Sequence, residues 1–445
     1  MFKKVLPLSA ILSLGFLGLF LVLPMLSVYA LSLEGATPFL VGVVVGGYAL
    51  TQVIFQIPFG KLSDSIGRKP TLLIGLSIFF IGSLIAAFAT DIYMLMLGRF
   101  LQGAGAIGSV ITAMISDLVP EEVRGKAMAI MGGSIALAFA LSMILGPVIG
   151  GNYGVDVLFM ITASLAILSV IILFTKVPTP PRIKHTYHEK SKISDILKDK
   201  NILSMIVINA MQKGLMTFAF VLIPIFLTKE SFGFNWENAD LYKAYVPAMI
   251  LGILAMGPAA IFGEKKNIPR EIFLISIVLF FVSFVIMGFT NSDVVFVVGV
   301  AAFFIAFNMM EPLVQSMISK FAKVHQKGTA LGLSNSVAYF MTFIGGISAG
   351  ALLHYADEEL ITRDMIGMIL AGITFLWLLW TLRLSNPLRH AHLYIPQADV
   401  DMNKLSLLEK EHIAEWYINE TENLIVIKYE AKAIDEEELK AKICK

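Results

Sequence analysis

Three charged residues stand inside long apolar stretches of this sequence, Arg99, Lys213 and Glu311. A charge in the hydrocarbon core of a membrane is costly, so one that is retained there marks a substrate or ion pathway by default. At a rise of 1.5 Å per helical residue, Glu311 lies about 13 Å before Lys320. By the same measure Lys213 lies about 18 Å after Asn201, so both charges are predicted near the middle of a membrane.

A carboxylate that gains and loses a cationic partner as a protein changes conformation can bind and release a proton. Lys213 and Glu311 are therefore candidates for a proton-coupling pair, and Arg99 is a third candidate. Two other interpretations stay open. Lys213 and Glu311 could form a permanent ion pair without a role in transport, and Arg99 could serve only to bind helix carbonyl groups.

Amide side chains accompany these charges at helical spacing, which places them on the same helix faces. The sets are Asn308 with Glu311 and Gln315, Asn209 with Lys213, and Gln102 with Arg99. Polar contacts to a substrate are predicted for Tyr29, Tyr48, Gln52, Gln102, Asn209, Asn308 and Tyr339. The 22 methionines and 32 phenylalanines can form adaptable apolar walls, although methionine is also common in membrane helices.

The composition shows what kind of elements must hold these residues. Of the 445 residues, 57% are hydrophobic and 15% are charged, whereas roughly 25% are charged in an average soluble domain. The sequence therefore predicts a membrane protein. The single cysteine, Cys444, excludes an internal disulfide framework and a cysteine-rich metal site. No nucleophile–base pair or metal-ligand pattern is present, so no enzyme activity, metal or cofactor is predicted.

Twelve stretches reach the roughly 20 apolar residues that a helix needs to cross a bilayer. They are predicted at residues 5–31, 39–60, 71–89, 93–116, 127–149, 156–175, 201–228, 244–262, 272–289, 294–319, 329–353 and 365–384. Lysine and arginine concentrate at the N-terminus and in every second loop. The positive-inside rule therefore predicts that both termini are cytoplasmic.

The chain is predicted to consist of two six-helix halves, at residues 1–177 and 201–385, joined by a cytoplasmic linker at residues 178–200. The linker contains three prolines, and the segment from Lys176 to Lys200 carries seven lysines and arginines. The halves repeat weakly, because Gly60 recurs as Gly263 and the segment 124–127 recurs as 327–330, in both cases 203 residues later. Parallel repeats of this kind occur in secondary transporters.

An acidic domain is predicted at residues 390–445, with seven lysines and arginines against twelve aspartates and glutamates. The pattern predicts strands at 392–395, 415–419 and 424–430, a helix at 403–414 and a second helix from Asp435. This order resembles a ferredoxin-like domain of the heavy-metal-associated type without its last strand. The domain has no Cys-x-x-Cys pair, so metal binding is not predicted.

The loop between the second and third predicted spans has glycines and charges at distinctive positions. Gly60 and Gly67 permit close helix approach and a tight turn. Asp64, Arg68 and Lys69 can form a charge latch at the cytoplasmic surface. Asp117, at the end of the fourth span, is a candidate partner. The segment from Gly60 to Pro70 resembles motif A of the major facilitator superfamily. In the second half the segment from Gly263 to Arg270 lacks the aspartate, which argues against a symmetrical second latch.

Two further segments resemble motifs of the same superfamily. The segment from Arg99 to Gly105 resembles motif B, whose arginine is associated with proton coupling. Gly146, Pro147, Gly150 and Gly151 resemble motif C, which is typical of the drug:proton antiporter branch. A cluster of this kind can also serve only to pack or kink a helix. The resemblance covers residues 1 to about 385, and the acidic domain is similar to that of efflux members with an appended C-terminal domain.

The resemblance implies an all-α membrane protein with twelve transmembrane helices in two bundles around a central cavity, plus the small α+β domain. It implies a proton-driven transporter, active as a monomer in the inner membrane of a bacterium, that exports an amphipathic compound. The expected partners are this compound, protons and the lipid bilayer, but not nucleic acid. The alternatives are a proton-coupled symporter of a sugar or organic anion, disfavoured by motif C, and a membrane receptor that does not transport.

Overall fold

The computed structural model describes residues 2–119, 121–178, 193–322, 326–387, 390–400, 404, 413–419, 424–430 and 434–443. Within these residues, twelve helical segments are long and apolar enough to cross a membrane. The predicted number of spans is therefore confirmed, and several helices extend beyond their predicted ends. The largest extension is in α7, which spans Glu121–Tyr153, followed by α3, which runs on to Ser65, and α14, which spans Lys327–Asp357.

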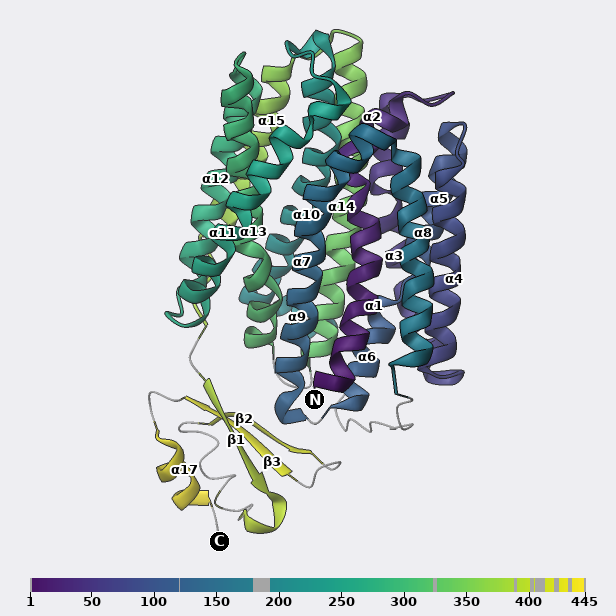
Figure 1. Cartoon of the computed structure of the whole chain (residues 1–445). Helices are drawn as coiled ribbons and strands as arrows, with labels where there is room; N and C mark the ends of the chain where they lie inside the picture. Colours follow the sequence, from purple (N-terminus) through teal and green to yellow (C-terminus); the bar gives the residue numbers. More distant parts are fainter. Residues whose placement is uncertain are drawn as a thin grey trace.

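The first half of the chain contains six spans (Figure 1). They are α1 (Phe2–Leu21) with α2 (Leu23–Leu31), α3 (Pro38–Ser65), α4 (Arg68–Ala87), α5 (Ile92–Ala104) with α6 (Gly108–Leu118), α7 (Glu121–Tyr153) and α8 (Val155–Thr175). The first and fourth spans are each broken into two helices, which the sequence did not predict. Pro24 at the start of α2 cannot donate a backbone hydrogen bond. At the second break, a Cβ atom on Gly105 would lie 2.6 Å from the carbonyl oxygen of Gly75, so the backbones approach closely there.

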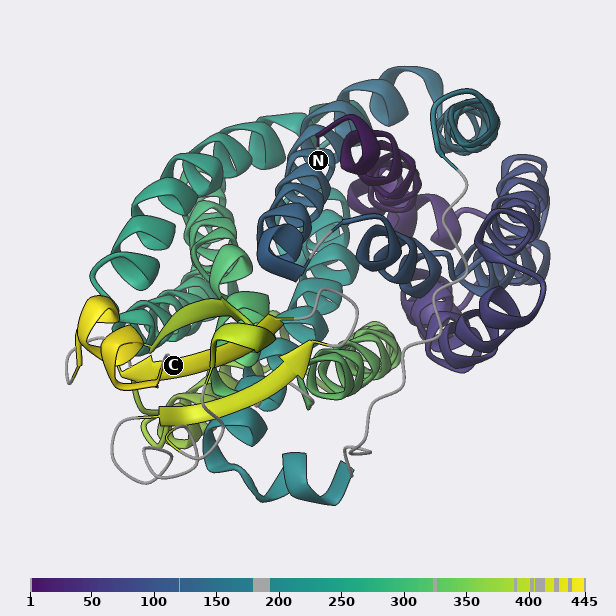
Figure 2. The ribbon, with the colours of Figure 1, turned by 90° about the horizontal axis from the view of Figure 1, so that it is seen from below.

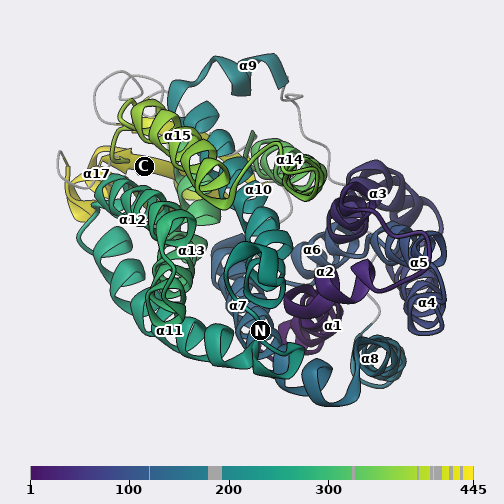
Figure 3. The same cartoon turned by 90° about the horizontal axis from the view of Figure 1, so that it is seen from above.

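The second half contains the other six spans. They are α10 (Lys200–Thr228), α11 (Tyr242–Glu264, preceded by η2, Asn238–Asp240), α12 (Pro269–Phe289), α13 (Asp293–Phe321), α14 (Lys327–Asp357) and α15 (Arg363–Thr381). The short helices α9 (Ile193–Lys198) and η1 (Glu230–Phe232) lie outside the spans. Figure 3 shows α7, α10 and α14 along the seam between the halves, with α3, α4, α5 and α8 on one side and α11, α12 and α15 on the other.

The N-terminus and the C-terminal domain lie at the same end of the helical bundle (Figure 1). We call this end the basic side, because the loops predicted to be cytoplasmic lie there, and we call the other end the far side. At the far side the halves pack closely. A Cβ atom on Gly42 of α3 would lie 2.1 Å from the carbonyl oxygen of Gly346 of α14. A Cβ atom on Gly350 would lie 2.6 Å from the carbonyl oxygen of Pro38.

Toward the basic side the same two helices are not in close contact. A Cβ atom on Gly60 of α3, or on Gly328 or Gly332 of α14, would meet no atom within 4 Å. The halves are therefore packed together at the far side and separated along α3 and α14 at the basic side.

The C-terminal domain contains a three-stranded antiparallel sheet with the strand order β1-β3-β2, seen from below the bundle in Figure 2. The strands are β1 (His390–Pro396), β2 (Ile413–Asn419) and β3 (Leu424–Glu430), and α17 (Glu436–Ile443) follows them. Apolar residues of the strands and of α17, including Leu393, Ile427 and Leu439, form one buried core. The predicted strands are present. The helix predicted at 403–414 lies almost wholly outside the described residues, and its last two positions belong to β2.

Candidate functional site

Lys213 and Glu311 meet midway along α10 and α13. The Nζ atom of Lys213 lies 2.8 Å from Oε2 and 2.9 Å from Oε1 of Glu311. The Nε2 atom of Gln212 also donates to Oε2 of Glu311, at 3.1 Å. The ammonium group of Lys213 lies 4.9 Å from the ring centroid of Phe307. The carboxylate is therefore held by one cation and one amide.

This ion pair keeps access to solvent. The side chains of Lys213 and Glu311 are 23% and 30% exposed, although both residues lie in the middle of their spans. One helical turn nearer the basic side, Nε2 of Gln315 donates to Oδ1 of Asn335 on α14 at 2.9 Å, in an exposed position. Polar side chains of α13 and α14 thus extend from Glu311 toward the basic side.

Arg99 lies in the core of the first half and is fully buried. Its Nη1 atom donates to Oε1 of Gln102 at 2.7 Å, and its Nε atom donates to the carbonyl oxygen of Val44 at 3.3 Å. The guanidinium carbon is 4.8 Å from the ring centroid of Tyr48. Within the described residues, its Nη2 atom has no hydrogen-bond partner. Arg99 is thus held by an amide, a carbonyl group and a ring, without an acidic partner in these contacts.

A hydrogen bond joins the two halves at the depth of these charges. The Nε2 atom of Gln52 on α3 donates to the hydroxyl oxygen of Tyr339 on α14 at 3.5 Å. Tyr339 packs against the cluster that contains Tyr48. Gln52 and Tyr339 therefore connect the half that contains Arg99 to the half that contains the ion pair.

The remaining predicted cavity residues use their polar groups inside one half. The Nδ2 atom of Asn209 donates to Oγ of Ser334 on α14 at 2.9 Å. The Nδ2 atom of Asn308 donates to the carbonyl oxygen of Phe304 at 2.8 Å, and it packs against α11. Gln102 donates to Ser83 at 3.0 Å, and Tyr29 lies partly buried on α2 near the far side. Helical spacing predicted shared faces for these residues but not the neighbouring helix that each face meets.

The motif A residues form an ion-paired latch at the basic end of the first half. The Nε atom of Arg68 donates to Asp117 at 2.9 Å, and its Nη1 atom donates to both Asp64 and Ser63 at 2.6 Å. Gly67, with φ of +102°, precedes α4 and makes the turn that positions Arg68. Asp117 is 7% exposed and Asp64 is 69% exposed, so Asp117 is the buried partner. Lys69 follows Arg68 in α4 and takes no part in these hydrogen bonds.

The second half carries an ion pair at the same end, with a base at the position that corresponds to Asp117. Glu264, at the end of α11, accepts hydrogen bonds from Ser316 and Lys320 of α13. Lys320 comes 203 residues after Asp117, which is the spacing of the sequence repeat. The missing aspartate therefore does not leave this end without an ion pair. The sequence signal that was missed is the exchange of the acid at position 117 for a base at position 320.

The motif C glycines let α7 lie directly against its neighbours. A Cβ atom on Gly146 would lie 2.2 Å from the carbonyl oxygen of Leu21, and one on Gly150 would lie 2.8 Å from the Leu158 side chain. A Cβ atom on Gly151 would lie 2.8 Å from the Cα atom of Ala239, which belongs to the other half. Pro147 lies between them inside α7. This cluster is thus part of the packing that closes the far side.

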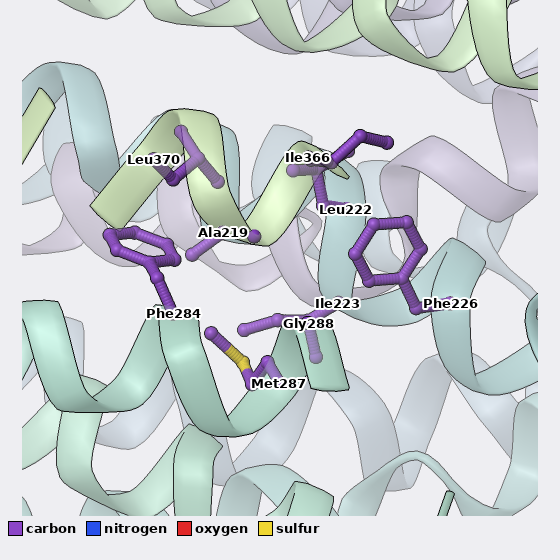
Figure 4. A pocket seen from close by; sticks show the side chains of 10 residues that line it. Ala219, Leu222, Ile223, Phe226, Phe284, Met287, Gly288, Ile366 and Leu370 are labelled. Atoms are coloured by element: carbon purple, nitrogen blue, oxygen red, sulfur yellow. The ribbon is translucent and has the colours of Figure 1, made fainter. Parts of the chain in front are cut away.

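The described part of the chain has cavities away from the ion pair. An apolar void of about 10 Å³ lies between α10, α12 and α15. Figure 4 shows the side chains that line it, such as Leu222, Phe284 and Ile366. It has room for about one water molecule at most, so it is a packing gap. A larger depression of about 510 Å³ lies at the far side between the halves, lined by Ser32 and Leu31 from one half and by Thr228 and Trp236 from the other. Within the described residues, no cluster of His, Cys, Asp and Glu could hold a metal ion.

Comparison with known proteins agrees with this architecture. Residues 8–346 and 266–418 match the sequence profile of the Major Facilitator Superfamily. The chain is 34% identical to the inner membrane transport protein YajR of Escherichia coli (strain K12), over 98% of this chain and 96% of that protein. It is 28% identical to the quinolone resistance protein NorA of Staphylococcus aureus (strain MRSA252), over 80% of this chain and 92% of that protein.

A solved structure with the same fold is that of the nucleoside transporter NupG. The TM-score is 0.68 at 16% sequence identity, over 85% of this chain and 98% of that one. The fold and the family expected from the motifs are therefore confirmed, in a family of transporters rather than enzymes. This chain is a member of the major facilitator superfamily, a multi-pass membrane protein of the secondary transporter class.

Proposed function

We propose that this protein is a proton-driven antiporter that exports a small, amphipathic compound across the inner membrane of a bacterium. The observation that carries the proposal is the Lys213–Glu311 ion pair, which lies well inside two membrane-spanning helices and whose side chains are partly exposed. The similarity to a quinolone resistance protein supports a drug-like substrate. The topology supports a functional monomer, because one chain supplies both halves.

In this proposal, Glu311 has a different protonation state in each conformation and pairs with Lys213 in only one of them. When the far side opens, a proton from outside binds the Glu311 carboxylate and releases Lys213. When the basic side opens, the proton leaves and Lys213 pairs with Glu311 again, as in the present structure. In an antiporter the deprotonated site binds the substrate when the basic side is open, and protonation of Glu311 from the far side weakens that binding and releases the substrate there. Coupling follows because the two events use the same carboxylate in alternate conformations.

The orientation of the chain is part of this proposal. The N-terminus and the C-terminal domain lie on one side of the bundle, and the lysine-rich loops lie there as well. Positive loops face the cytoplasm, so the present conformation is open to the cytoplasm. Fusion of a fluorescent protein to the C-terminus should give fluorescent cells, whereas a fused periplasmic alkaline phosphatase should be inactive.

Flux in proteoliposomes tests the function. Vesicles with an acidic interior and an enclosed pH-sensitive dye are exposed to a fluorescent quinolone. Antiport predicts faster interior alkalinisation than in protein-free vesicles, together with quinolone accumulation. Proton uptake driven by an added sugar would instead indicate a symporter. Absence of flux with both classes of compound, from protein shown to be folded, would contradict the transport proposal and favour a receptor.

A further inference from the structure

The segment that joins the last span to the C-terminal domain is bound to the membrane part by side-chain hydrogen bonds. We call residues 385–387 the tail linker. Oδ1 of Asn386 accepts a hydrogen bond from the backbone N–H of Arg270 at 2.9 Å, and Nδ2 of Asn386 donates to Glu271 at 3.0 Å. The Nδ2 atom of Asn267 donates to the carbonyl oxygen of Pro387 at 2.7 Å. Pro387 itself is buried.

These contacts complete the start of α12. The first N–H groups of a helix have no partner within it and need a capping acceptor. Ile268, which precedes α12, supplies no side-chain acceptor, so Asn386 caps the helix from a distant part of the chain. Asn267 has φ of +61°, a left-handed conformation that asparagine tolerates better than most residues. Its backbone conformation aims the amide at the tail linker.

A third anchor connects the tail linker to α10. The backbone N–H and the hydroxyl group of Ser385 both donate to Oδ1 of Asn201, at 3.1 and 2.9 Å. Asn201 belongs to the first turn of α10, and Lys213 lies on the same helix about 18 Å further along. The tail linker is therefore bonded to the beginnings of two spans, α10 and α12.

Asn267 and Glu271 of the second half occupy the positions that two motif A residues occupy in the first half. Asn267 and Glu271 come 203 residues after Asp64 and Arg68, which bind each other in the motif A latch. In the second half the equivalent positions carry an amide and an acid, and both bind the tail linker instead. The loss of the motif A pattern in this loop thus coincides with a different set of contacts.

We propose that the loop at residues 264–271 is a docking site for the tail linker, which fixes the C-terminal domain to the second half and passes its movements to α10 and α12. His390 begins β1 and is three residues after Pro387, so it lies within about 11 Å of this anchor. The domain therefore moves with the second half when the two halves rock against each other. A partner or ion that displaces the domain would act first on the beginnings of these two helices.

Spin-label distances in the full-length chain test this proposal without a substrate, so the result does not depend on proton coupling. In a Cys444→Ser background, labels are placed at Ile418→Cys on β2 and Ile261→Cys on α11, which are exposed positions. A second pair combines Ile418→Cys with the exposed Ile74→Cys on α4 of the first half. The tail linker is released by combining three substitutions. Asn267→Gly keeps the left-handed backbone accessible, Asn386→Ala removes the cap of α12, and Asn201→Ala removes the acceptor of Ser385.

We expect the domain to α11 distance distribution to be narrower than the domain to α4 distribution, and to widen at least twofold when the linker is released. Ser276→Ala is the matched control, because it removes a side-chain hydrogen bond within α12 that does not involve the linker. An unchanged width in the released variant would overturn the proposal. Equal widening by Ser276→Ala, or a narrower distribution to α4 than to α11, would overturn it as well.

Discussion

The carboxylate of Glu311 has two nitrogen partners, Lys213 and Gln212, and only one of them carries a charge. Glu311→Gln keeps the shape of the side chain but cannot carry a proton, and it leaves Lys213 without its counter-charge. We expect quinolone transport driven by a pH gradient to be lost, while quinolone binding stays measurable. Fluorescence titration and flux measured on the same preparation separate these two effects.

Glu358→Gln is the control for Glu311→Gln, because it makes the same chemical change on an exposed carboxylate at the far end of α14. Uphill transport by Glu311→Gln at a rate close to that of Glu358→Gln would identify another group as the proton carrier.

The two acids of the motif A latch differ in burial. This difference predicts which substitution slows transport more. Asp117 is almost fully buried against Arg68, and a hydrogen bond to a charged group contributes about 1.5–3 kcal/mol. Asp64 is largely exposed, and such pairs contribute about 0–1 kcal/mol. We expect both Asp64→Asn and Asp117→Asn to insert into the membrane and to slow transport, with the larger effect in Asp117→Asn. Equal rates for both variants and the unmodified protein would exclude the latch from the transport cycle.

Gln52 and Tyr339 provide a hydrogen bond between the halves that a double-mutant cycle can measure. Tyr339→Phe and Gln52→Leu each remove one partner, and a neutral hydrogen bond of this kind contributes about 0.5–1.5 kcal/mol. If the bond stabilises the present conformation, the effects of the two substitutions on the thermal unfolding midpoint should be less than additive in the double variant. Additive effects would show that the two side chains do not interact in solution.

Sequence reasoning identified the charges of the site but only part of their surroundings. Lys213 and Glu311 were predictable because a charge at the middle of a membrane span is rare. The orientation of Asn308 toward α11 was not, because helical spacing gives shared faces without naming the neighbouring helix. The ion pair of Glu264 with Lys320 was missed because Lys320 is a base where Asp117 is an acid, and its partner Glu264 corresponds in the repeat to Lys61 and not to Arg68.

At the scale of elements, the crossing of α3 and α14 closes the far side through glycine contacts. A Cβ atom on Gly42 would lie 2.1 Å from a backbone oxygen of α14, so Gly42→Ala must separate the two helices. We expect this variant to favour opening of the far side. Spin labels at Ser32→Cys and Glu237→Cys, which replace residues lining the depression there from opposite halves, should then report a longer distance.

Gly332→Ala on α14 is the matched control for Gly42→Ala, because a Cβ atom at this position meets nothing within 4 Å. The distance between the spin labels in this variant should equal that in the unmodified protein. Alanine also favours a helix over glycine by about 1 kcal/mol, so the substitution should not disrupt α14. Equal distances in all three proteins would show that the glycine crossing does not determine which side is open.

The elements themselves were largely predictable, with exceptions that have local causes. The length of each apolar stretch identified the twelve spans, because a stretch of about 20 apolar residues is what a helix needs to cross a bilayer. The breaks before Pro24 and at Gly105 were missed because they interrupt spans whose composition stays apolar throughout. The end of the helix predicted at 403–414 was wrong, because Ile413 and Ala414 belong to β2, in which Ile413 pairs with Tyr429 of β3.

At the scale of the whole molecule, the sequence predicted two halves and an acidic domain but not their arrangement. The conformation depends on the balance between far-side and basic-side contacts, and both sets are compatible with the same pattern of spans. The binding of the tail linker to the loop at 264–271 could not be predicted from the sequence either. Asn267 of the loop and Asn386 of the tail linker are 119 positions apart, and neither belongs to a recognisable motif. Long-range pairs of this kind follow from the fold.

Deleting residues 390–445 is expected to leave a folded, inserted transporter with altered regulation. None of the membrane charges discussed lies in this domain, which has its own small core, and the truncation keeps the tail linker and its bonds to α10 and α12. The domain carries twelve acids against seven bases, and the segment from Lys176 to Lys200 carries seven bases. The attraction between the acidic domain and the segment from Lys176 to Lys200 should weaken as the salt concentration rises, because charges are screened over about 10 Å at 0.1 M ionic strength.

Quinolone transport measured against ionic strength, for the full-length and the truncated chain, tests this expectation. The transport rate of the full-length protein should change more steeply with salt concentration than the rate of the truncated protein. Only the full-length chain has an acidic domain that the basic segment can attract. Parallel curves would show that the domain does not regulate through charge. An inserted but inactive truncation would show that the domain is needed for the transport cycle itself, which would contradict the placement of all proton-coupling groups in the twelve spans.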